Sequence, residues 1–356
     1  MLSALADAGG DLDGVRIRST QAGADVLRQV GRQRYGIGVV VDESDQVLGA
    51  VTDGDLRRAV LAGQRMDAPI TEFMSHRIPM VSALTPEDQV LDLLHGHRLR
   101  GVPVVEGGEL VGMRSLRRLP HEHGPRTAVI MAGGRGSRLR PVTDSVPTPL
   151  LKVGSTSIVE RLLAAFTDAG VDEVYLAVNY LAEVFEQRLG TGDHLGTAVR
   201  YLREEDAMGT AGALSLLPPV DRGPILVTNG DILTTLNFSR LFDFHWRNRA
   251  AITVAGVEYR SPIPYGVLRN AEHHLLSIDE KPERRDLCSA VIYVLAPEVL
   301  PLLPPKEALG MPELIALALA EGMAVNVFPI VESWYDIGDT AQLERVLLRV
   351  AVGDDD

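Results

Sequence analysis

Several residue patterns that mark common classes of protein are scarce or absent in this chain. The 356 residues hold a single cysteine, Cys288, which excludes an internal disulfide framework, and neither a CxxC pair nor a His/Cys cluster with zinc spacing occurs. No stretch approaches the roughly 20 apolar residues of a membrane span, and residues 1–10 lack the basic start and apolar core of a signal peptide. We therefore expect a soluble, cytoplasmic protein with no membrane partner.

Basic residues are also fewer than acidic ones. Asp and Glu number 48 against 35 Lys and Arg, and the formal net charge is -13. This balance argues against a general nucleic-acid binder and leaves phosphate recognition to local basic clusters. The length suffices for two domains, each with its own core.

What the chain does contain is a glycine-rich stretch from Ala128 to Leu151, AVIMAGGRGSRLRPVTDSVPTPLL. Its apolar start predicts a buried strand that ends in a loop with three glycines followed by Arg138. Such a loop suits a polyphosphate, because glycines let backbone N–H groups approach phosphate oxygens and an arginine adds a forked, charged donor. The GGxG pattern also occurs in plain turns, so the assignment needs support from the rest of the chain.

Two familiar phosphate loops are excluded. Gly136 is followed by Ser137 rather than by the lysine of a Walker loop, and Leu139 stands where a dinucleotide fingerprint needs its last glycine. The run MAGGRGSRLRPVT, with the PTPLLKVG that follows it, instead resembles the signature of sugar-1-phosphate nucleotidyltransferases, which make an NDP-sugar and pyrophosphate from an NTP and a sugar phosphate. The resemblance implies that the arginine holds the leaving pyrophosphate. The implied nucleotide contacts in this loop are Ala132, Gly133, Gly134, Gly136, Ser137 and Arg138.

The elements expected after this loop are those of an α/β domain. Ser157 and Glu160 form a capping box for a helix that continues to about Gly170. The further expected elements are strands at 174–178, 198–202 and 225–227 and a helix at 182–189. Strands alternating with helices predict a Rossmann-like domain with a mostly parallel, mixed sheet, and ligands of such sheets bind at the carboxyl ends of the strands.

Two aspartates are placed to hold a divalent cation. Asp231 ends the sequence Asn229-Gly230-Asp231 after one expected strand, and Asp336, in Trp334-Tyr-Asp-Ile-Gly338, follows an apolar strand at 325–330. A hard ion such as Mg²⁺ takes carboxylates together with substrate phosphates. Either aspartate alone would suit a turn or a helix cap. The resemblance implies that both hold the metal and that Asp231 is catalytic.

Further motifs match the same family. Gly209-Thr-Ala-Gly-Ala-Leu214 matches a loop that approaches the base and sugar, which implies nucleotide contacts from Gly209, Thr210 and Gly212. Pro264-Tyr-Gly-Val267 matches a strand whose backbone, at Gly266, meets the sugar. Glu280-Lys-Pro282 matches a motif in which Glu280 accepts from sugar hydroxyls and Lys281, a catalytic residue by this resemblance, binds the sugar phosphate. Asn229 is the remaining implied sugar-phosphate contact. Without these motifs a Glu-Lys pair would be an ordinary surface pair.

The first third of the chain contains an internal repeat. The segments 36–41 and 49–56 are echoed by 101–105 and 112–119, and in each copy an amphipathic stretch, 24–33 or 86–96, precedes the two short strands. This pattern resembles a pair of CBS domains. We therefore expect a tandem CBS module (α+β) at 1–124 and a nucleotidyltransferase domain at 125–356, with the polar segment His121 to Arg126 between them.

The CBS resemblance also implies a regulatory purine nucleotide site. In the first copy Thr52 would contact phosphate and Asp55 the ribose hydroxyls. The second copy has Ser115 and Arg118 at these positions, so we expect at most one complete cleft. A pair that only mediates oligomerisation is the alternative, because a fold does not carry its function with it. In either case we expect a homo-oligomer.

Two positions depart from the family pattern. Thr148 stands where the family has the lysine that neutralises the α-phosphate and pyrophosphate; by analogy, such a loss slows the reaction by about 10² to 10³. Arg135 and Lys152 are the candidates to compensate for it. In Ser289-Ala-Val-Ile-Tyr293, Val291 replaces a glycine near the sugar, which predicts a changed acceptor such as a cyclitol or deoxysugar phosphate.

From these residues we expect an enzyme, a Mg²⁺-dependent nucleotidyltransferase (pyrophosphorylase) that joins an NTP to a sugar or cyclitol 1-phosphate. GTP is favoured because the likeness is closest to CBS-containing guanylyltransferases of bacterial legionaminic acid pathways. The alternative is a catalytically degenerate protein that binds a nucleotide or NDP-sugar and regulates through its CBS pair. Thr148 and Val291 motivate this alternative, whereas the two retained aspartates count against it.

Overall fold

The computed structural model describes residues 5–8, 12–33, 35–97, 99–116, 126–220 and 223–351. The chain divides into two compact units, Met1–Glu122 and His123–Asp356. The predicted domain boundary at 124 and the predicted ribose position Arg118 lie outside the described residues.

The first unit contains two copies of one small module, as the repeat predicts. In the first copy β2 (Arg16–Arg18) lies parallel to β3 (Ile37–Val41), and β3 pairs antiparallel with β4 (Val47–Thr52). In the second copy β1 (Leu5–Ala8), β6 (Glu109–Leu116) and β5 (Gly101–Glu106) form an antiparallel sheet in the order β1-β6-β5. The helices are α1 (Gly23–Arg32), α2 (Asp53–Leu61) and α3 (Glu87–Gly96). Each predicted amphipathic stretch is a helix that precedes its strand pair.

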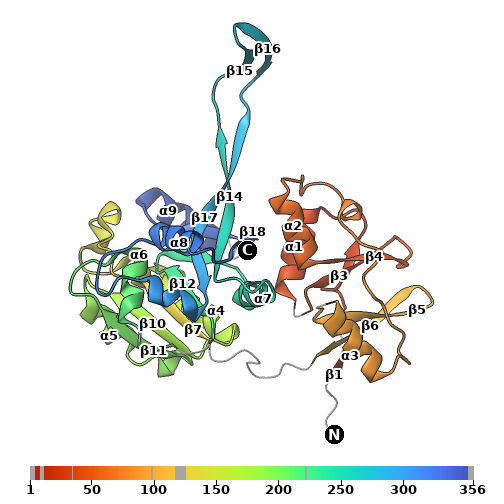
Figure 1. The fold of residues 1–356 in the computed structure, drawn as a ribbon, viewed down its shortest axis with the longest axis horizontal. Helices are drawn as coiled ribbons and strands as arrows, with labels where there is room; N and C mark the ends of the chain where they lie inside the picture. The colour runs from red at the N-terminus through yellow and green to blue at the C-terminus, as the bar shows by residue number, and fades with distance from the viewer. Residues whose placement is uncertain are drawn as a thin grey trace. The chain divides into compact units, whose positions relative to one another are not determined.

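The second unit is built on a seven-stranded mixed sheet in the order β11-β10-β7-β12-β17-β14-β18 (Figure 1). Its strands are β7 (Thr127–Met131), β10 (Glu173–Val178), β11 (Ala198–Arg203), β12 (Ile225–Asn229), β14 (Ile252–Pro262), β17 (Glu283–Leu295) and β18 (Val325–Ile330). Only β17 runs antiparallel to its neighbours, so the predicted mostly parallel sheet is confirmed.

Helices cover both faces of this sheet. Alternate residues of β7 divide between two cores: Ala128 and Ile130 pack in one, and Val129 packs in the other. The first core is closed by α4 (Ile158–Asp168), α5 (Ala182–Leu189) and α7 (Phe238–Arg247), and the second by α6 (Gly209–Gly212) and α8 (Met311–Ala320). The sheet therefore leaves only its strand ends open to ligands. No helix within the described ranges has the length and apolar character needed to cross a bilayer.

The predicted capping box fixes the start of α4. Ser157 Oγ accepts from the backbone N–H of Glu160, and the Glu160 carboxylate accepts from the Ser157 N–H at 2.6 Å. Short strands flank this start, β8 (Lys152–Val153) and β9 (Thr156–Ser157). A two-stranded ribbon of β13 (Ile232–Thr234) and β19 (Trp334–Asp336) and the helix α9 (Thr340–Ala351) complete this part of the unit.

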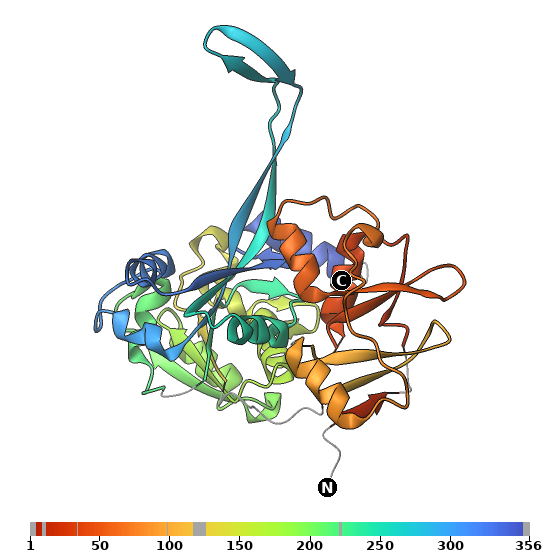
Figure 2. The ribbon, with the colours of Figure 1, turned by 45° about the vertical axis from the view of Figure 1, so that its right-hand side comes forward.

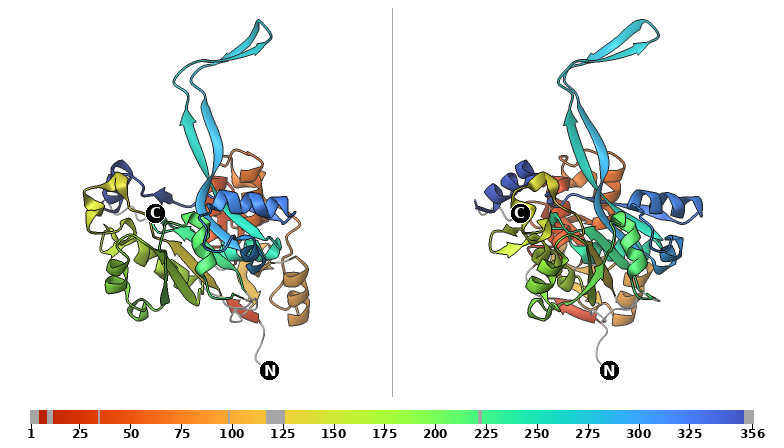
Figure 3. Two further views of the ribbon diagram at one scale, coloured as in Figure 1. Left: turned by 60° about the vertical axis from the view of Figure 1, so that its left-hand side comes forward. Right: turned by 90° about the vertical axis from the view of Figure 1, so that its left-hand side faces the viewer.

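A long β arm is the feature that the sequence did not predict. Strands β14 and β17 continue together beyond the sheet and carry the hairpin of β15 (Val267–Ala271) and β16 (His274–Asp279) at their far end (Figures 1 and 2). Figure 3 shows the arm extending from the body of the unit in two further views. Nearly all of its side chains beyond Val257 are exposed or half-buried.

Candidate active site

The glycine loop begins where the central strand β7 ends. Parallel pairing places Met131, the last residue of β7, beside Asn229, the last residue of β12. The N–H of Ala132 donates to the Ala177 carbonyl at 2.8 Å, and the N–H of Gly230 donates to the Met131 carbonyl at 2.9 Å. The carboxyl ends of three neighbouring strands thus hold the glycine loop and the Asn-Gly-Asp turn side by side, as expected for an α/β ligand site.

A cavity of about 360 Å³ lies at these strand ends. It is within the range of small-molecule sites, roughly 300–1,000 Å³. It is lined by the predicted metal ligand Asp231, by the predicted sugar-phosphate contact Asn229 and by most of the predicted nucleotide residues, namely Ala132, Gly133, Gly134, Gly136, Ser137, Arg138, Gly209 and Thr210. The structure therefore brings together motifs that are far apart in the sequence.

Two of these glycines are required by the backbone around the cavity. Gly136 has φ +57°, and a Cβ there would lie 2.6 Å from Thr148 Oγ1. Gly209 has φ +76°, and a Cβ there would lie 2.6 Å from the carbonyl oxygen of Leu309. Both positions thus combine a left-handed conformation with close packing that only glycine tolerates.

The two predicted metal aspartates meet in the β13–β19 ribbon. Asp231 directly precedes β13, Asp336 ends β19 opposite Ile232, and the N–H of Ile337 donates to the Asp231 carbonyl at 2.9 Å. Burial, and then the charge of Asp336, raises the pKa of Asp231 to about 6. Burial also raises the pKa of Asp336, whereas Arg138 opposes the rise at both carboxyls. The arginine and both aspartates therefore share one electrostatic environment.

The orphaned carboxylate oxygen at Asp231 fits a cation ligand. Asp231 Oδ1 is buried and has no hydrogen-bond partner. No group of three or more His, Cys, Asp or Glu side chains suited to a metal occurs among the described residues, so protein ligands alone would not fill a coordination shell. Mg²⁺ commonly keeps waters and substrate phosphates and takes only one or two carboxylates. Asp231 and Asp336 are the residues that would hold such an ion.

One further acidic side chain, Glu204, lines the cavity although no sequence motif contains it. It lies beside the glycine loop, since a Cβ on Gly133 would be 2.9 Å from Glu204 Oε1, and its Oε2 accepts from the Met208 N–H at 2.8 Å. Burial raises the pKa of Glu204, and the hydrogen bond from Met208 opposes that rise. Its position in the acidic run Glu204-Glu205-Asp206 resembles a solvated loop, so nothing in the sequence distinguished it.

Thr148 is buried beneath the glycine loop and lines the cavity, with 6% of its surface exposed. Neither Arg135 nor Lys152, the two candidates to replace the missing lysine, is among the lining residues, and both are exposed. Arg138 is therefore the cationic side chain that lines this cavity.

The predicted sugar-phosphate residues on the arm do not line the cavity. Gly266, Glu280 and Lys281 are exposed at the base of the β15–β16 hairpin, where a Cβ on Gly266 would lie 3.1 Å from Glu280 Oε2. Pro264 to Gly266 connect β14 to β15, so the predicted strand begins only at Val267. The three residues thus lie together, but apart from the glycine loop.

Two other predicted positions also lie outside the cavity lining. Gly212 is buried at the end of α6, where a Cβ would lie 2.5 Å from the Glu307 carbonyl oxygen, so packing accounts for this glycine. Val291 adopts φ +57°, a conformation rare for a β-branched residue. The glycine of the family pattern suits this backbone, and the strain is a physical consequence of the substitution.

In the first unit Thr52 and Asp55 bond to each other. Thr52 caps α2 by accepting from the Asp55 N–H at 3.1 Å, and its hydroxyl donates to the Asp55 carboxylate at 2.6 Å. Arg58 forms an ion pair with the same carboxylate. Their predicted nucleotide role stays a prediction.

Comparisons with known proteins identify the family of the chain. A nucleotidyl transferase model matches residues 127–351, and a CBS domain model matches 17–62 and 70–119. The chain is 31% identical over 224 residues to a mannose-1-phosphate guanylyltransferase of Mycobacterium tuberculosis, covering 61% of this chain and 62% of that protein. It is 32% identical over 219 residues to a mannose-1-phosphate guanyltransferase of Kluyveromyces lactis, covering 59% and 60%.

The chain thus spans about three fifths of the length of these curated relatives. Among solved structures, HddC from Yersinia pseudotuberculosis superposes with a TM-score of 0.50 at 21% identity, covering 63% of this chain and 99% of that one. This likeness concerns the fold alone. The family match covers most of the chain, from the glycine loop to the last helix. The chain belongs to the nucleotidyl transferase family and carries a pair of CBS domains ahead of its nucleotidyl transferase domain.

Proposed function

We propose that this protein transfers a nucleotidyl group from an NTP to a sugar-like 1-phosphate and releases pyrophosphate. One observation carries the proposal: the glycine loop, Arg138 and the orphaned carboxylate of Asp231 line a single cavity at the strand ends. An oxygen of the acceptor phosphate attacks the α-phosphorus in line, and the bond from that phosphorus to the bridging oxygen of pyrophosphate breaks. No proton has to move, since the attacking phosphate is already ionised.

The residues of the cavity position and neutralise phosphates. Backbone N–H groups of the loop from Gly133 to Ser137 face the triphosphate, and Arg138 offsets the charge of the leaving pyrophosphate. Mg²⁺, held by Asp231 and Asp336, would supply further neutralisation of the phosphate oxygens. Because this chemistry is mainly positioning and electrostatics, no nucleophilic side chain is needed.

Glu204 supports GTP as the nucleotide. Guanine carries an N1–H and a 2-amino group on one edge, and a carboxylate accepts from both. Oε1 of Glu204 lies against the glycine loop, and the carboxylate is half-buried, so its bonds to a base would be shielded from water. Adenine has no 2-amino group, so the Glu204 carboxylate would accept fewer hydrogen bonds from it than from guanine.

We infer that the arm completes the acceptor site. Gly266, Glu280 and Lys281 lie together on the arm, and the cavity offers Arg138 as its cationic side chain. Closing the arm toward the cavity would bring a lysine to the incoming phosphate. Val291, near the root of the arm, supports an acceptor that differs from an ordinary hexose, such as a cyclitol or deoxysugar 1-phosphate.

The proposal includes a cytoplasmic homo-oligomer whose CBS pair binds a purine nucleotide near Thr52 and Asp55. The degenerate alternative has no observation in its favour beyond Thr148 and Val291. A sensor without catalysis has no need of two half-buried carboxylates whose pKa values are raised by burial.

The proposal is tested by measuring pyrophosphate release with Mg²⁺, the four NTPs and a panel of hexose, hexosamine and cyclitol 1-phosphates. Turnover of one pair by the wild type supports it, and Thr148→Lys shows what the missing lysine costs. If the wild type binds GTP without turnover and Thr148→Lys restores turnover, the natural chain is not an enzyme.

A further inference from the structure

The arm leaves the sheet at the edge where the glycine-loop cavity lies, and its tip points away from the body of the unit (Figures 1 and 3). Ile292 of β17 pairs with Thr228 near the end of β12, so the residues before Ile292 run past the strand ends. The ladder of β14 and β17 then continues without interruption from Gly256 to Pro262. At about 3.3 Å per residue, the far end of this ladder lies roughly 20 Å from Gly256, and Lys281 comes just beyond it.

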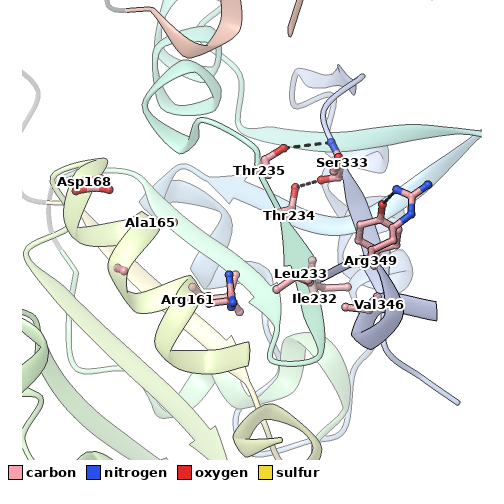
Figure 4. Close-up of a pocket in the computed structure, with 13 residues that line it drawn as sticks. Arg161, Ala165, Asp168, Ile232, Leu233, Thr234, Thr235, Ser333, Val346 and Arg349 are labelled. Atoms are coloured by element: carbon pink, nitrogen blue, oxygen red, sulfur yellow. Dashed lines mark hydrogen bonds between the residues drawn. The ribbon is translucent and has the colours of Figure 1, made fainter. Parts of the chain in front are cut away.

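Both halves of the acceptor site are held in place within one copy of the chain. On the arm, the N–H of Ile263 donates to the Pro282 carbonyl at 2.9 Å, which continues the ladder to the hairpin. On the cavity side, two hydroxyls fix the ribbon of the aspartates. Thr234 donates to the Ser333 carbonyl at 2.7 Å, and the Ser333 N–H donates to Thr235 Oγ1 at 3.2 Å (Figure 4). To reach the cavity of its own chain, the arm would have to fold back on itself and lose ladder hydrogen bonds.

The hairpin at the end of the arm has one apolar face. Leu268 and Ile278 pair across β15 and β16, and Leu276 lies two residues before Ile278; these three residues define the apolar face of the hairpin. The opposite face carries the ion pair of Arg269 with Asp279 at 2.9 Å. The three apolar side chains are 55–69% exposed. A two-stranded ribbon is marginal in water unless such a face is packed, so the hairpin needs a partner surface.

The apolar face is continuous with the predicted acceptor residues. A Cβ on Gly266 would lie 3.1 Å from both Ile278 Cγ2 and Glu280 Oε2, and Lys281 follows Glu280. Any surface that covers the apolar face therefore comes close to Glu280 and Lys281. An unrelated partner at this place would shield these residues from a sugar phosphate. A second copy of this chain instead brings the cavity that they have to meet.

The cavity and the arm are complementary in charge. Arg138 is the one cation among the described residues that line the cavity, and Glu204 and Asp231 in the same lining are acidic. The acceptor phosphate has to approach a triphosphate, so a further cation at the cavity would lower the repulsion between the two. Lys281 is the cation that the hairpin offers.

We propose that two copies of the chain exchange their arms, so that the hairpin of each copy docks at the cavity of the other. Glu280 and Lys281 of one copy then bind the sugar-like phosphate beside Arg138 and Asp231 of the second copy, and the apolar face packs on that copy. Exchange of identical elements is a simple route to a symmetric dimer, because the same contact forms twice. The docking is independent of the proposed function, whereas the role in the acceptor site rests on it.

Mixed dimers of two differently tagged copies test the exchange, with pyrophosphate release measured at an acceptor concentration well below KM. When Asp231→Asn is paired with Lys281→Ala, exchanged arms give one of the two sites an intact cavity and an intact lysine. We therefore expect about half of the wild-type rate. If each copy uses its own arm, both sites are defective. A rate no higher than the mean of the two variants measured alone would overturn the proposal.

The reciprocal pairing should give the opposite result. When the wild type is paired with the double variant Asp231→Asn/Lys281→Ala, exchanged arms leave a defect in both sites, so we expect a loss of about tenfold or more. About half of the wild-type rate would show that each copy uses its own arm. Lys306→Ala, at an exposed position of the same unit, is the control for Lys281→Ala, and both pairings should then retain about half of the wild-type rate.

A cross-link tests the docking without any turnover. In a Cys288→Ser background, one copy carries Lys281→Cys and the other carries Ser137→Cys, at an exposed position of the cavity lining. We expect a short bismaleimide to join the two copies covalently, and Lys306→Cys in place of Lys281→Cys to give no such product. Absence of the covalent dimer, or a wild type that sediments as a monomer, would overturn the exchange. A covalent dimer of a protein that turns over no acceptor would contradict the proposed function alone.

Discussion

The carboxylate of Asp231 is held in a charged state at a cost to the fold. Its pKa is about 6, above the ordinary 3.8, because the side chain is buried and faces Asp336. Because the pKa of Asp231 is higher in the folded than in the unfolded protein, protonation of Asp231 stabilises the fold. This contribution to the free energy of unfolding is fully present below about pH 4 and is lost as the pH rises through 6. A metal ion would reverse that loss, since it compensates the charge.

Asp231→Asn is therefore expected to stabilise the metal-free protein near neutral pH. The upper limit is about 3 kcal/mol, and the gain should shrink as the pH falls from about 6 toward 4, where the wild-type carboxyl is itself neutral. Urea unfolding with EDTA at several pH values measures it. Asp193→Asn, an exposed position of the same unit, should show no such trend. A pH-independent difference for Asp231→Asn would contradict this electrostatic account.

The proposed preference for GTP makes base selectivity depend on one residue, Glu204. Glu204→Gln keeps the shape but replaces one acceptor oxygen with a donor, so we expect the preference for GTP over ATP in kcat/KM to fall by about tenfold. Glu205→Gln, at the exposed neighbouring position, is the control and should keep the wild-type preference. Equal selectivity in the two variants would remove Glu204 from base recognition.

At the scale of elements, the proposed function requires the arm to supply part of the acceptor site. Lys281 is exposed on the arm, so Lys281→Ala should leave the melting temperature unchanged while raising KM for the sugar-like phosphate by about tenfold or more, the effect of a lost charge-assisted contact. Steady-state kinetics with the acceptor varied measure this change. Lys306→Ala, exposed on the surface of the same unit, should behave as the wild type. An unchanged KM would show that the arm does not reach the acceptor.

Elements with strong local patterns could be predicted from the sequence. The helix Ala182–Leu189 and the strand Val325–Ile330 lie where their patterns indicate, and the Ser157–Glu160 capping box begins α4 as expected. The glycine loop and Asp231 line one cavity, and Asp336 pairs with Ile232 next to Asp231, while the roles of these residues stay predictions. Local signals suffice here because each element contains the residues that begin it, end it or bury it.

The arm and Glu204 could not be predicted because their roles depend on tertiary surroundings. Leu275, Leu276 and Ile278 form an apolar run that would suit a buried strand equally well, yet these side chains are 55–69% exposed. Likewise Glu204 and Glu205 have the same side chain at neighbouring positions, and only the folded chain brings the first against Gly133. The sequence contains no local signal for either outcome.

At the scale of the whole molecule, the exposed arm is where we expect the proposed homo-oligomer to form its contact. Leu268 and Ile278 face each other across the hairpin and, with Leu276, are 55–69% exposed, which is unusual on a two-stranded ribbon with no further strand. Leu276→Asp should therefore lower the mass of the assembly measured by sedimentation. Leu317→Asp, on the exposed face of α8, is the control and should sediment as the wild type does. An unchanged mass for Leu276→Asp would place the contact between copies elsewhere.

Nucleotidyl transfer in the glycine-loop cavity is tested most directly by measuring pyrophosphate release with GTP and the best acceptor phosphate, for the wild type and for Asp231→Asn. We expect Mg²⁺-dependent release accompanied by an NDP-linked product in the wild type. A loss of about 10² or more in kcat is expected for Asp231→Asn, as for other groups that stabilise transition-state charge. Full activity of Asp231→Asn, or no product from the wild type with any acceptor, would contradict the account.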